Sequence, residues 1–344
     1  MNQEVERKEN SSLNPIKIVK EHVDEEVEDV KGTTDISDKE PIKEKKSEES
    51  QDEEIIEIDL KKRKEQTLKF LKQKKEWIFY IILAFIVYIG ISIRIRNIPR
   101  LRDITTGSWT LGPDLDPFLF LRWAKEILET GGLATIDLMR NVPLGFNTAG
   151  EAKLLSYLIV WFHKSASFFT GNPDITYSAI IFPVFMFGLT TIAFFLFARK
   201  VFYKEEKNIR NIIALVATSF FILVPSLLPR TIAGIPEKES AAFFFIFLSF
   251  YFFIEAFTTK KIKKSFIFGV LAGISTGLLG LIWGGVTFVF MTVAGAIFFS
   301  FLLGKIERKD LYVFGIWIIS FIVVSMPFST RYSPINLITS TSTG

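Results

Sequence analysis

The sequence contains no cysteine and only two histidines among its 344 residues. The lack of cysteine excludes disulfide bonds, cysteine-ligated zinc and thiol nucleophiles. No short apolar stretch follows Met1, so no signal peptide is predicted. The net charge of +4 averages over two unlike parts and is no sign of nucleic-acid binding. Apolar residues make up 49% of the chain, with 36 Phe, and they are concentrated after the first seventy-odd positions.

The chain divides into two parts of different composition. Residues 1–76 are rich in Glu, Lys, Asp and Ser, and such a segment buries too little apolar surface to offset the entropy lost on ordering. We predict a disordered, charged cytoplasmic tail here, whose last part, 59–76, has the composition of a charged helix. Residues 77–344 are predicted to form an all-α domain that crosses a membrane several times.

Seven apolar segments are long enough to cross a bilayer. They are 77–93, 175–198, 212–228, 241–257, 266–283, 286–303 and 311–328. Gly284 and Gly285 supply the turn between the fifth and the sixth. The segment 152–170 is apolar as well, but Lys153 and Lys164 interrupt it, so its role depends on the orientation of the other segments.

The distribution of positive charge predicts that orientation, because short cytoplasmic loops collect lysine and arginine. With seven spans and a cytoplasmic N-terminus, the three basic loops 199–210, 258–265 and 304–310 are cytoplasmic. An eighth span over 152–170 would place them outside, so we interpret that segment as an amphipathic helix on the outer membrane surface. The arginines at 94, 96, 100 and 102 oppose this orientation, but the later loops outweigh them. We predict a multi-pass cell-membrane protein with a long external loop over 94–174.

Two acidic residues, Asp114 and Asp116, lie in this external loop directly before a predicted amphipathic helix over 119–130. An Asp followed by Pro117 is typical of a helix N-cap, so capping is one interpretation. The other is ligation of a metal ion. The two are compatible, because a capping backbone also fixes the direction of the carboxylate.

A second acidic pair, Glu237 and Glu239, precedes the fourth span. Acids after Pro236 are typical of a helix start, but two carboxylates beside Arg230 and Lys238 are more charge than a start requires. Carboxylate oxygens are the ligands that Mg²⁺ and Mn²⁺ prefer. Arg230 is either a phosphate partner or an interfacial residue whose head group reaches water. Because both pairs are expected outside, they predict one shared divalent metal site.

Both motifs resemble those of oligosaccharyltransferase catalytic subunits of the archaeal type, which belong to the C-type glycosyltransferase superfamily. The matching residues are Asp114, Asp116, Phe118 and Arg122 in the first motif, and Arg230, Gly234, Glu237 and Glu239 in the second. The family has the same order of one span, a long external loop and a second motif after the third span. The resemblance covers roughly residue 77 to the end.

The resemblance implies the inverting transfer of an oligosaccharide from a dolichol-linked phosphate or pyrophosphate to the Asn side chain of an Asn-x-Ser/Thr sequon in an acceptor polypeptide. It implies that Asp116, Glu237 and Glu239 ligate Mn²⁺ or Mg²⁺, which acts as a Lewis acid at the leaving phosphate. Asp116 would also orient the acceptor amide, and Arg230 would pair with phosphate. Asp114 would lie behind the ligands. The expected partners are the lipid-linked donor, the acceptor polypeptide and membrane lipid, and no nucleic acid.

The sequence departs from the family pattern in three respects. Its second motif has Glu where many relatives have Asp, and the chain contains neither the third acidic residue of a later external loop nor the Trp-Trp-Asp-Tyr-Gly motif of a C-terminal soluble domain. We therefore expect a truncated or split chain that binds metal weakly and does not catalyse transfer by itself.

Two other functions remain open. Another polyprenol-phosphate-dependent membrane glycosyltransferase would also have an acid after its first span, and the paired second motif argues against it. A transporter would need ionisable groups within its spans, and its sequence would consist of two similar halves. Neither feature is evident here.

Overall fold

The computed structural model describes residues 62–65, 76–171 and 174–339. Its contacts divide the chain into two units, 1–69 and 70–344, and all elements discussed here belong to the second. The predicted disordered tail over 1–76 lies almost wholly outside the described residues.

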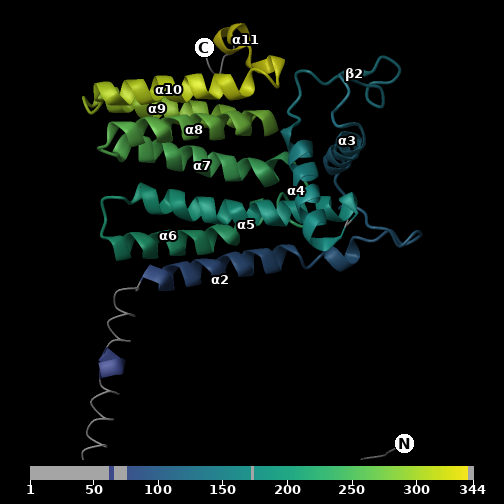
Figure 1. Ribbon diagram of the computed structural model, residues 1–344, viewed down its shortest axis with the longest axis horizontal. Helices are drawn as coiled ribbons and strands as arrows, with labels where there is room; N and C mark the ends of the chain where they lie inside the picture. Colours follow the sequence, from purple (N-terminus) through teal and green to yellow (C-terminus); the bar gives the residue numbers. More distant parts are fainter. Residues whose placement is uncertain (1–61, 66–75, 172–173, 340–344) are drawn as a thin grey trace, which may run out of the picture. The chain divides into compact units, whose positions relative to one another are not determined.

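Seven helices run side by side and form a bundle (Figure 1). They are α2 (Glu76–Arg94), α5 (Ile175–Val201), α6 (Lys207–Ile222), α7 (Lys238–Thr258), α8 (Ile262–Ile282), α9 (Val286–Leu302) and α10 (Arg308–Ser325). Each coincides with one of the predicted spans, which confirms the all-α multi-span fold. α6 ends earlier than predicted because Pro225, which has no N–H to donate, begins a 3₁₀ turn (η2, Pro225–Leu227).

Among the described residues, four helices are long and apolar enough to cross a membrane by length and composition. They are α2, α5, α7 and α8, and α9 is a shorter apolar helix. α10 falls short because its first turn contains three charged residues, Arg308, Lys309 and Asp310. α6 has only 16 residues. The helices are therefore where the sequence predicts them, and four of the seven meet the length and hydropathy of a full span.

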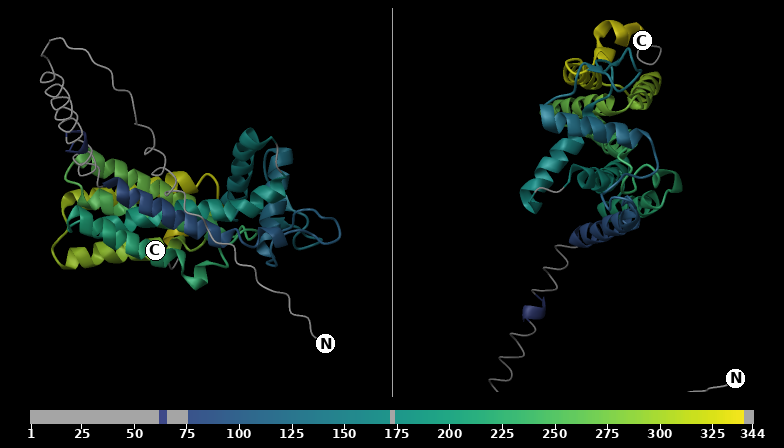
Figure 2. Two further views of the ribbon diagram at one scale, coloured as in Figure 1. Left: turned by 90° about the horizontal axis from the view of Figure 1, so that it is seen from below. Right: turned by 90° about the vertical axis from the view of Figure 1, so that its right-hand side faces the viewer.

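The remaining elements gather at one end of the bundle, which we call the loop end. α3 (Asp116–Thr130) and α4 (Leu154–Thr170) flank a small antiparallel hairpin of β1 (Ile136–Asp137) and β2 (Phe146–Asn147). α4 runs across the direction of the bundle helices in two views (Figures 1 and 2), as expected for the segment that we did not count as a span. Short helices η1 (Ile98–Arg100), η3 (Thr330–Tyr332) and α11 (Pro334–Thr339) complete this end.

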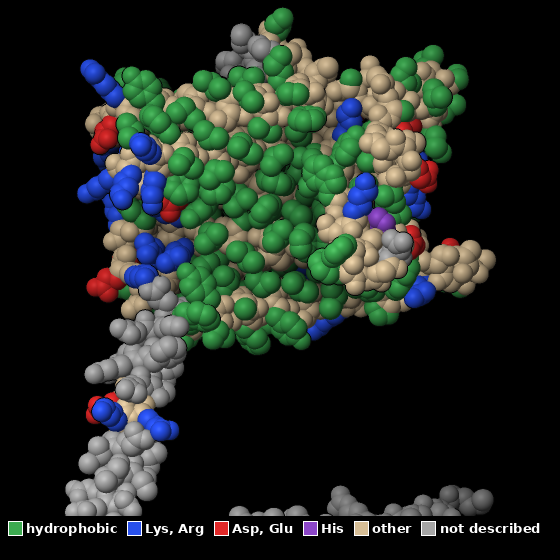
Figure 3. Space-filling view, viewed as in Figure 1, with side chains coloured by type: hydrophobic (Ala, Val, Ile, Leu, Met, Phe, Trp, Pro, Cys, Tyr) green, Lys and Arg blue, Asp and Glu red, His purple; other side chains and the backbone are tan. Residues whose placement is uncertain are grey.

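The opposite end, which we call the basic end, consists of the short connections α5–α6, α7–α8 and α9–α10. Lysine and arginine side chains gather there, and a broad apolar belt separates them from the loop end (Figure 3). This arrangement matches the distribution of charge that predicted the orientation.

α8 and α10 pack closely because three glycines, Gly269, Gly273 and Gly277, recur every fourth residue on the α8 surface that faces α10. A Cβ added at Gly273 would lie 2.5 Å from the Trp317 carbonyl oxygen. Small residues at this spacing let two helix backbones approach in a membrane, where packing rather than the hydrophobic effect drives association. The Trp317 indole N–H donates to the Thr276 hydroxyl at 2.9 Å across the same interface.

Two of the arginines that oppose the predicted orientation are used in packing. The Arg94 side chain is fully buried, lies over the Phe187 ring at 3.3 Å, and donates from Nε to the Thr231 hydroxyl at 2.7 Å. Arg102 stacks over the Trp109 ring at 3.9 Å. These charges have specific partners within the protein, which weakens the objection that they raise to a cytoplasmic N-terminus.

Candidate functional site

The second motif lies at the loop end and is held there by its backbone. Gly234 has φ of +83°, a conformation that favours glycine, and a Cβ at this position would lie 2.5 Å from a Leu101 methyl carbon. The Gly234 N–H donates to the Ile180 carbonyl at 2.9 Å, and the Ala233 N–H donates to the Arg94 carbonyl at 3.0 Å. The segment before α7 is thereby fixed to α2 and α5.

The first motif is joined to the second by a main-chain hydrogen bond. The Gly112 N–H donates to the Gly234 carbonyl at 2.8 Å. A side chain at Gly112 would crowd Ile235, whose Cγ1 would lie 3.0 Å from an added Cβ. Two segments more than a hundred residues apart in sequence therefore meet at one place, as the prediction of a shared site requires.

Four charged side chains come together at this junction. The Arg230 Nη1 atom lies 2.5 Å from a Glu237 carboxylate oxygen and 3.9 Å from Asp114. The carboxyl groups of Asp114 and Glu239 are close enough to Glu237 to raise its pKa. Glu237 is only 5% exposed, and its burial, together with its two acidic neighbours, raises its pKa to about 7, although Arg230 acts in the opposite direction. The junction is thus a crowded set of carboxylates whose negative charge is only partly balanced.

Asp116 is the second aspartate of the first motif. It is the first residue of α3, is exposed, and has no hydrogen bond or ion pair within the described residues. Phe120 follows one turn later on the same side of α3, and its ring lies 5.5 Å from the Lys238 ammonium. The first turns of α3 and α7 are therefore neighbours. The structure brings Arg230, Glu237 and Glu239 together with Asp114 rather than with Asp116.

Neither acidic motif uses a carboxylate to cap its helix. The N-cap of α3 is Leu115, and Asp116 follows it inside the helix, so the capping interpretation of Asp116 is wrong. Glu237 occupies the N-cap position of α7, but its side chain makes no capping hydrogen bond. By contrast, Asp174 caps α5 by accepting a hydrogen bond from the Thr176 N–H at 2.9 Å. Asp114 accepts a hydrogen bond from the Leu115 N–H at 2.8 Å, whereas Asp116 and Glu237 make no capping hydrogen bond.

The donor set fits a hard divalent cation in chemistry, because it consists of carboxylate oxygens. As the side chains stand, no group of three or more His, Asp or Glu in the described part of the chain is arranged to hold a metal ion. Arg230 donates to one oxygen of Glu237, Oε2, at 2.5 Å. A cation at this junction would compete with the guanidinium for that oxygen.

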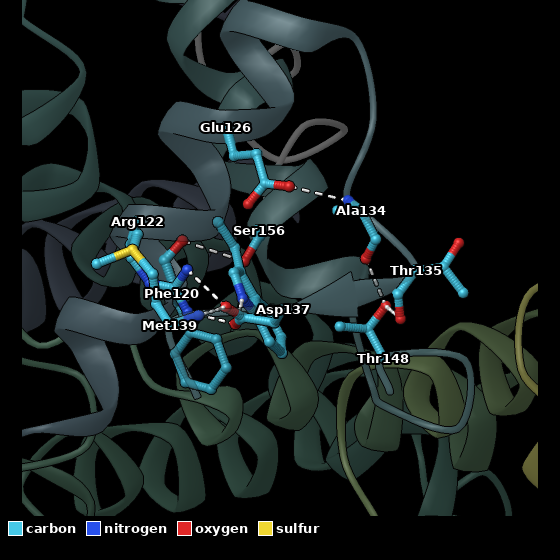
Figure 4. Close-up of polar contacts among 10 residues, drawn as sticks. Phe120, Arg122, Glu126, Ala134, Thr135, Asp137, Met139, Thr148 and Ser156 are labelled. Carbon is cyan, nitrogen blue, oxygen red and sulfur yellow. Dashed lines mark hydrogen bonds and ion pairs between the residues drawn. The ribbon is translucent and has the colours of Figure 1, made fainter. Parts of the chain in front are cut away.

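Arg122 of the first motif has a different role. It forms an ion pair with Asp137 of β1, and the Trp123 indole N–H donates to the same carboxylate at 2.9 Å (Figure 4). The hydrogen bonds from Arg122 are the main reason that the pKa of Asp137 is lowered to about 2. A short distance away, Glu126 accepts a hydrogen bond from the Ala134 N–H at 2.9 Å. These contacts fasten the hairpin to α3 beside the junction.

Two features of the site were not identified from the sequence. The burial of Arg94 does not follow from the sequence, because an arginine at the end of an apolar helix usually extends its head group to the membrane surface. Gly112 carried no prediction, although a glycine before Pro113 beside an acidic pair marks a place where the backbone can approach another segment.

The fold and the junction define a class, a multi-helix membrane protein with an acidic site at one end of its bundle. The family model described as "Oligosaccharyl transferase STT3, N-terminal" matches residues 78–340, and the chain belongs to this family.

Curated relatives agree with this assignment. The chain is 29% identical over 239 residues to dolichyl-phosphooligosaccharide-protein glycotransferase 1 of Pyrococcus furiosus, which covers 67% of this chain and 22% of that protein. It is 22% identical over 261 residues to subunit STT3 of the Saccharomyces cerevisiae dolichyl-diphosphooligosaccharide–protein glycosyltransferase, which covers 72% of this chain and 34% of that protein. The chain thus spans between about a fifth and a third of the length of these relatives.

Solved structures show the same fold. The oligosaccharyltransferase AglB of Archaeoglobus fulgidus, in complex with an inhibitory peptide and a dolichol-phosphate, has a TM-score of 0.64 at 20% identity. The match covers 77% of this chain and 32% of AglB. The A. fulgidus enzyme in complex with Zn and sulfate has a TM-score of 0.62, with coverage of 76% and 32%.

Proposed function

We propose that this chain provides the membrane part of an inverting, metal-dependent oligosaccharyltransferase. The enzyme would transfer an oligosaccharide from a dolichol-linked phosphate or pyrophosphate to the Asn side chain of an Asn-x-Ser/Thr sequon. The observation that carries the proposal is the meeting of the two acidic motifs at the Gly112–Gly234 hydrogen bond. The names of the Pyrococcus and yeast relatives support the reaction, and the peptide and dolichol-phosphate bound to AglB support the substrates.

Asp116, Glu237 and Glu239 are the proposed ligands of Mn²⁺ or Mg²⁺, with Asp114 as a further carboxylate within the cluster. When bound, the metal supplies a Lewis acid that stabilises the charge developing on the leaving phosphate. Arg230 balances the carboxylates in the absence of a cation and is 47% exposed, so it is free to turn towards an anionic donor. Its guanidinium then pairs with phosphate oxygens through two parallel N–H donors. Asp116, which is exposed at the start of α3, is the residue that we propose to orient the acceptor amide.

The metal assignment is tested by Mn²⁺ binding, measured by electron paramagnetic resonance on the purified chain. Glu237→Gln and Glu239→Gln are expected to weaken Mn²⁺ binding at least about tenfold, because each removes one anionic oxygen ligand. Asp174→Asn is the matched control, since Asp174 lies at the same end but caps α5. Unchanged binding in both glutamate variants would contradict the assignment.

The reaction is tested in membranes that contain the complete enzyme to which this chain contributes, with a fluorescent Asn-x-Thr peptide and a dolichol-linked oligosaccharide. Asp116→Asn and Glu237→Gln are expected to abolish the mobility shift of the peptide while the protein remains in the membrane, whereas Asp174→Asn leaves transfer intact. Transfer at the unaltered rate in Asp116→Asn and Glu237→Gln would refute the proposed roles.

The proposed orientation places the N-terminus and the basic end in the cytoplasm and the junction outside. Because the chain has no cysteine, a single introduced thiol reports its own side of the membrane. Ile104 at the loop end and Ile262 at the basic end are both exposed, at 103% and 55%. In intact cells an impermeant maleimide is expected to label Ile104→Cys and not Ile262→Cys, and the reverse pattern would overturn the orientation.

A further inference from the structure

A small polar cavity lies at the basic end, far from the acidic junction. It has a volume of about 180 Å³ and is lined by residues of α5, α6 and α7. The lining residues are Leu196, Arg199, Lys200, Arg210, Tyr251 and Glu255. A water molecule takes up about 30 Å³ in the liquid, so the cavity has room for a phosphate group and several waters.

The charges around this cavity do not balance. Lys200 pairs with Glu255 at 2.8 Å, which neutralises both side chains. Neither Arg199 nor Arg210 has a side-chain hydrogen bond or an ion pair with another described residue. The Nε–H groups of both arginines are buried without a hydrogen-bond partner. These two Nε atoms are enclosed by protein atoms, so they do not face the cavity. The cavity lining nevertheless contains three cationic side chains, Arg199, Lys200 and Arg210, against one carboxylate, Glu255, and this excess of positive charge favours an anion.

The cavity also borders the apolar belt. Phe185 and Ile192 precede Arg199 on α5 at intervals of seven residues, which places all three on nearly the same side of the helix. Their side chains are 44% and 41% exposed, so an apolar strip on the surface of α5 leads to Arg199. An anion that enters this cavity can therefore keep a hydrocarbon chain on that strip, outside the protein.

We propose that the cavity between α5, α6 and α7 binds the phosphate of an anionic membrane lipid through Arg199 and Arg210. The two guanidinium groups donate to the phosphate oxygens, and the acyl chains lie along Phe185 and Ile192. Lys200 stays with Glu255 and supplies the wall of the cavity. Basic pockets between helices at one face of a membrane protein suit lipid head groups of this kind. The inference uses none of the residues assigned to the transfer reaction.

The test is native mass spectrometry of the detergent-purified chain, titrated in separate arms with phosphatidylglycerol, phosphatidylcholine and inorganic phosphate. One phosphatidylglycerol per chain is expected to remain bound at collision energies that remove phosphatidylcholine. Arg199→Gln/Arg210→Gln is expected to weaken this binding at least about tenfold, because both charged donors are lost. The Arg199→Lys/Arg210→Lys variant keeps both charges but loses the parallel N–H donors of the guanidinium groups, so it should restore part of the affinity. Partial recovery would also show that the loss in the glutamine variant is not caused by misfolding.

The matched control is Lys263→Gln/Lys264→Gln, which removes two exposed charges from the same end without touching the cavity. It is expected to bind phosphatidylglycerol as the unaltered chain does. An equal loss in this control would show attraction by the basic end as a whole and would overturn the proposal. Equal retention of phosphatidylcholine, or displacement of phosphatidylglycerol by millimolar inorganic phosphate, would overturn the assignment to a lipid.

Discussion

The two ends of the bundle differ in the sign of the charge that remains unbalanced. At the loop end, three carboxyl groups crowd around one guanidinium, and Glu237 remains partly unbalanced. In the cavity at the basic end, one carboxylate, Glu255, pairs with Lys200, and Arg199 and Arg210 have no ion pair with another described residue. The acidic junction therefore has an excess of negative charge, and the cavity at the basic end has an excess of positive charge.

This difference determines which kind of ligand each end can bind. A cation relieves the repulsion among carboxylates, whereas an anion satisfies unpaired guanidinium donors. Both ends are built from the same bundle helices, with α5 and α7 reaching from one to the other. Changes at one end should therefore leave binding at the other intact unless they disrupt those helices, and four variants test this separation.

The largest effect is expected for Gly234→Ala, which puts a Cβ into Leu101 at a position with φ of +83°. The clash and the unfavourable backbone conformation should together lower the free energy of unfolding by about 2–4 kcal/mol. Tryptophan fluorescence during titration with sodium dodecyl sulfate measures this. Mn²⁺ binding should fall while phosphatidylglycerol binding persists.

Gly107→Ala is the control for backbone strain alone, because Gly107 has φ of +68° but no atom within 4 Å of an added Cβ. Gly107→Ala should lower the free energy of unfolding by about 1 kcal/mol. Equal effects of the two variants would show that the approach of Leu101 does not stabilise the junction.

A smaller effect is expected for Asp137→Asn, which leaves Arg122 without its carboxylate and should lower the free energy of unfolding by about 1.5–3 kcal/mol. The pKa of Asp137 is depressed to about 2, so its contribution is present above the unfolded-state pKa near 4 and is lost as the pH falls from there towards 2. Because Trp123 donates to the same carboxylate, its fluorescence should report that step. An acid transition that is identical in Asp137→Asn and in the unaltered chain would contradict this.

Arg230→Gln sharpens the comparison at the loop end. Removing the guanidinium from Glu237 removes the competitor of a cation, so the Kd for Mn²⁺ should fall by about threefold to tenfold. Titration followed by electron paramagnetic resonance measures it. Arg96→Gln, at an exposed position of the same end, should leave the Kd unchanged. Weaker Mn²⁺ binding in Arg230→Gln would mean that Arg230 supports the metal site and does not compete with the cation.

The smallest effect is expected for the corresponding variant at the basic end, Glu255→Gln. It frees Lys200 from its ion pair, and the affinity for phosphatidylglycerol should rise by about twofold to threefold, in keeping with a partly exposed pair worth about 0.5 kcal/mol. Glu205→Gln, an exposed acid of the neighbouring connection, is the control. No difference between these two variants would show that Lys200 does not face the bound anion.

Much of the fold could be predicted because spans of apolar residues are long and need no tertiary information. All seven helices and the crossing of α4 followed from hydropathy and charge. The end of α6 at Ile222 could not, because the chain stays apolar to Leu228 and only Pro225 interrupts it. The close packing of α8 on α10, which depends on Gly269, Gly273 and Gly277, was not predicted from the sequence.

The candidate site was predicted in part. Local sequence identified Arg230, Glu237 and Glu239 as a charged group, and the structure places them together. It did not identify which aspartate of the first motif joins them, because two residues in a turn point in directions that depend on distant contacts. Asp114 faces Arg230 since Gly112 is bonded to Gly234, a contact between segments that no local pattern encodes.

The bond between Gly112 and Gly234 joins a main-chain N–H to a main-chain carbonyl, and every residue type except proline possesses both groups. Main-chain atoms therefore fix the geometry of the junction, whereas the carboxylate side chains determine its chemistry. Exchanging Glu for Asp at position 237 or 239 changes the reach of an oxygen by one methylene but does not move the place where the segments meet. Substitution of the acidic residues can consequently change which cation or donor binds without changing the scaffold, provided that Gly112 and Gly234 are retained.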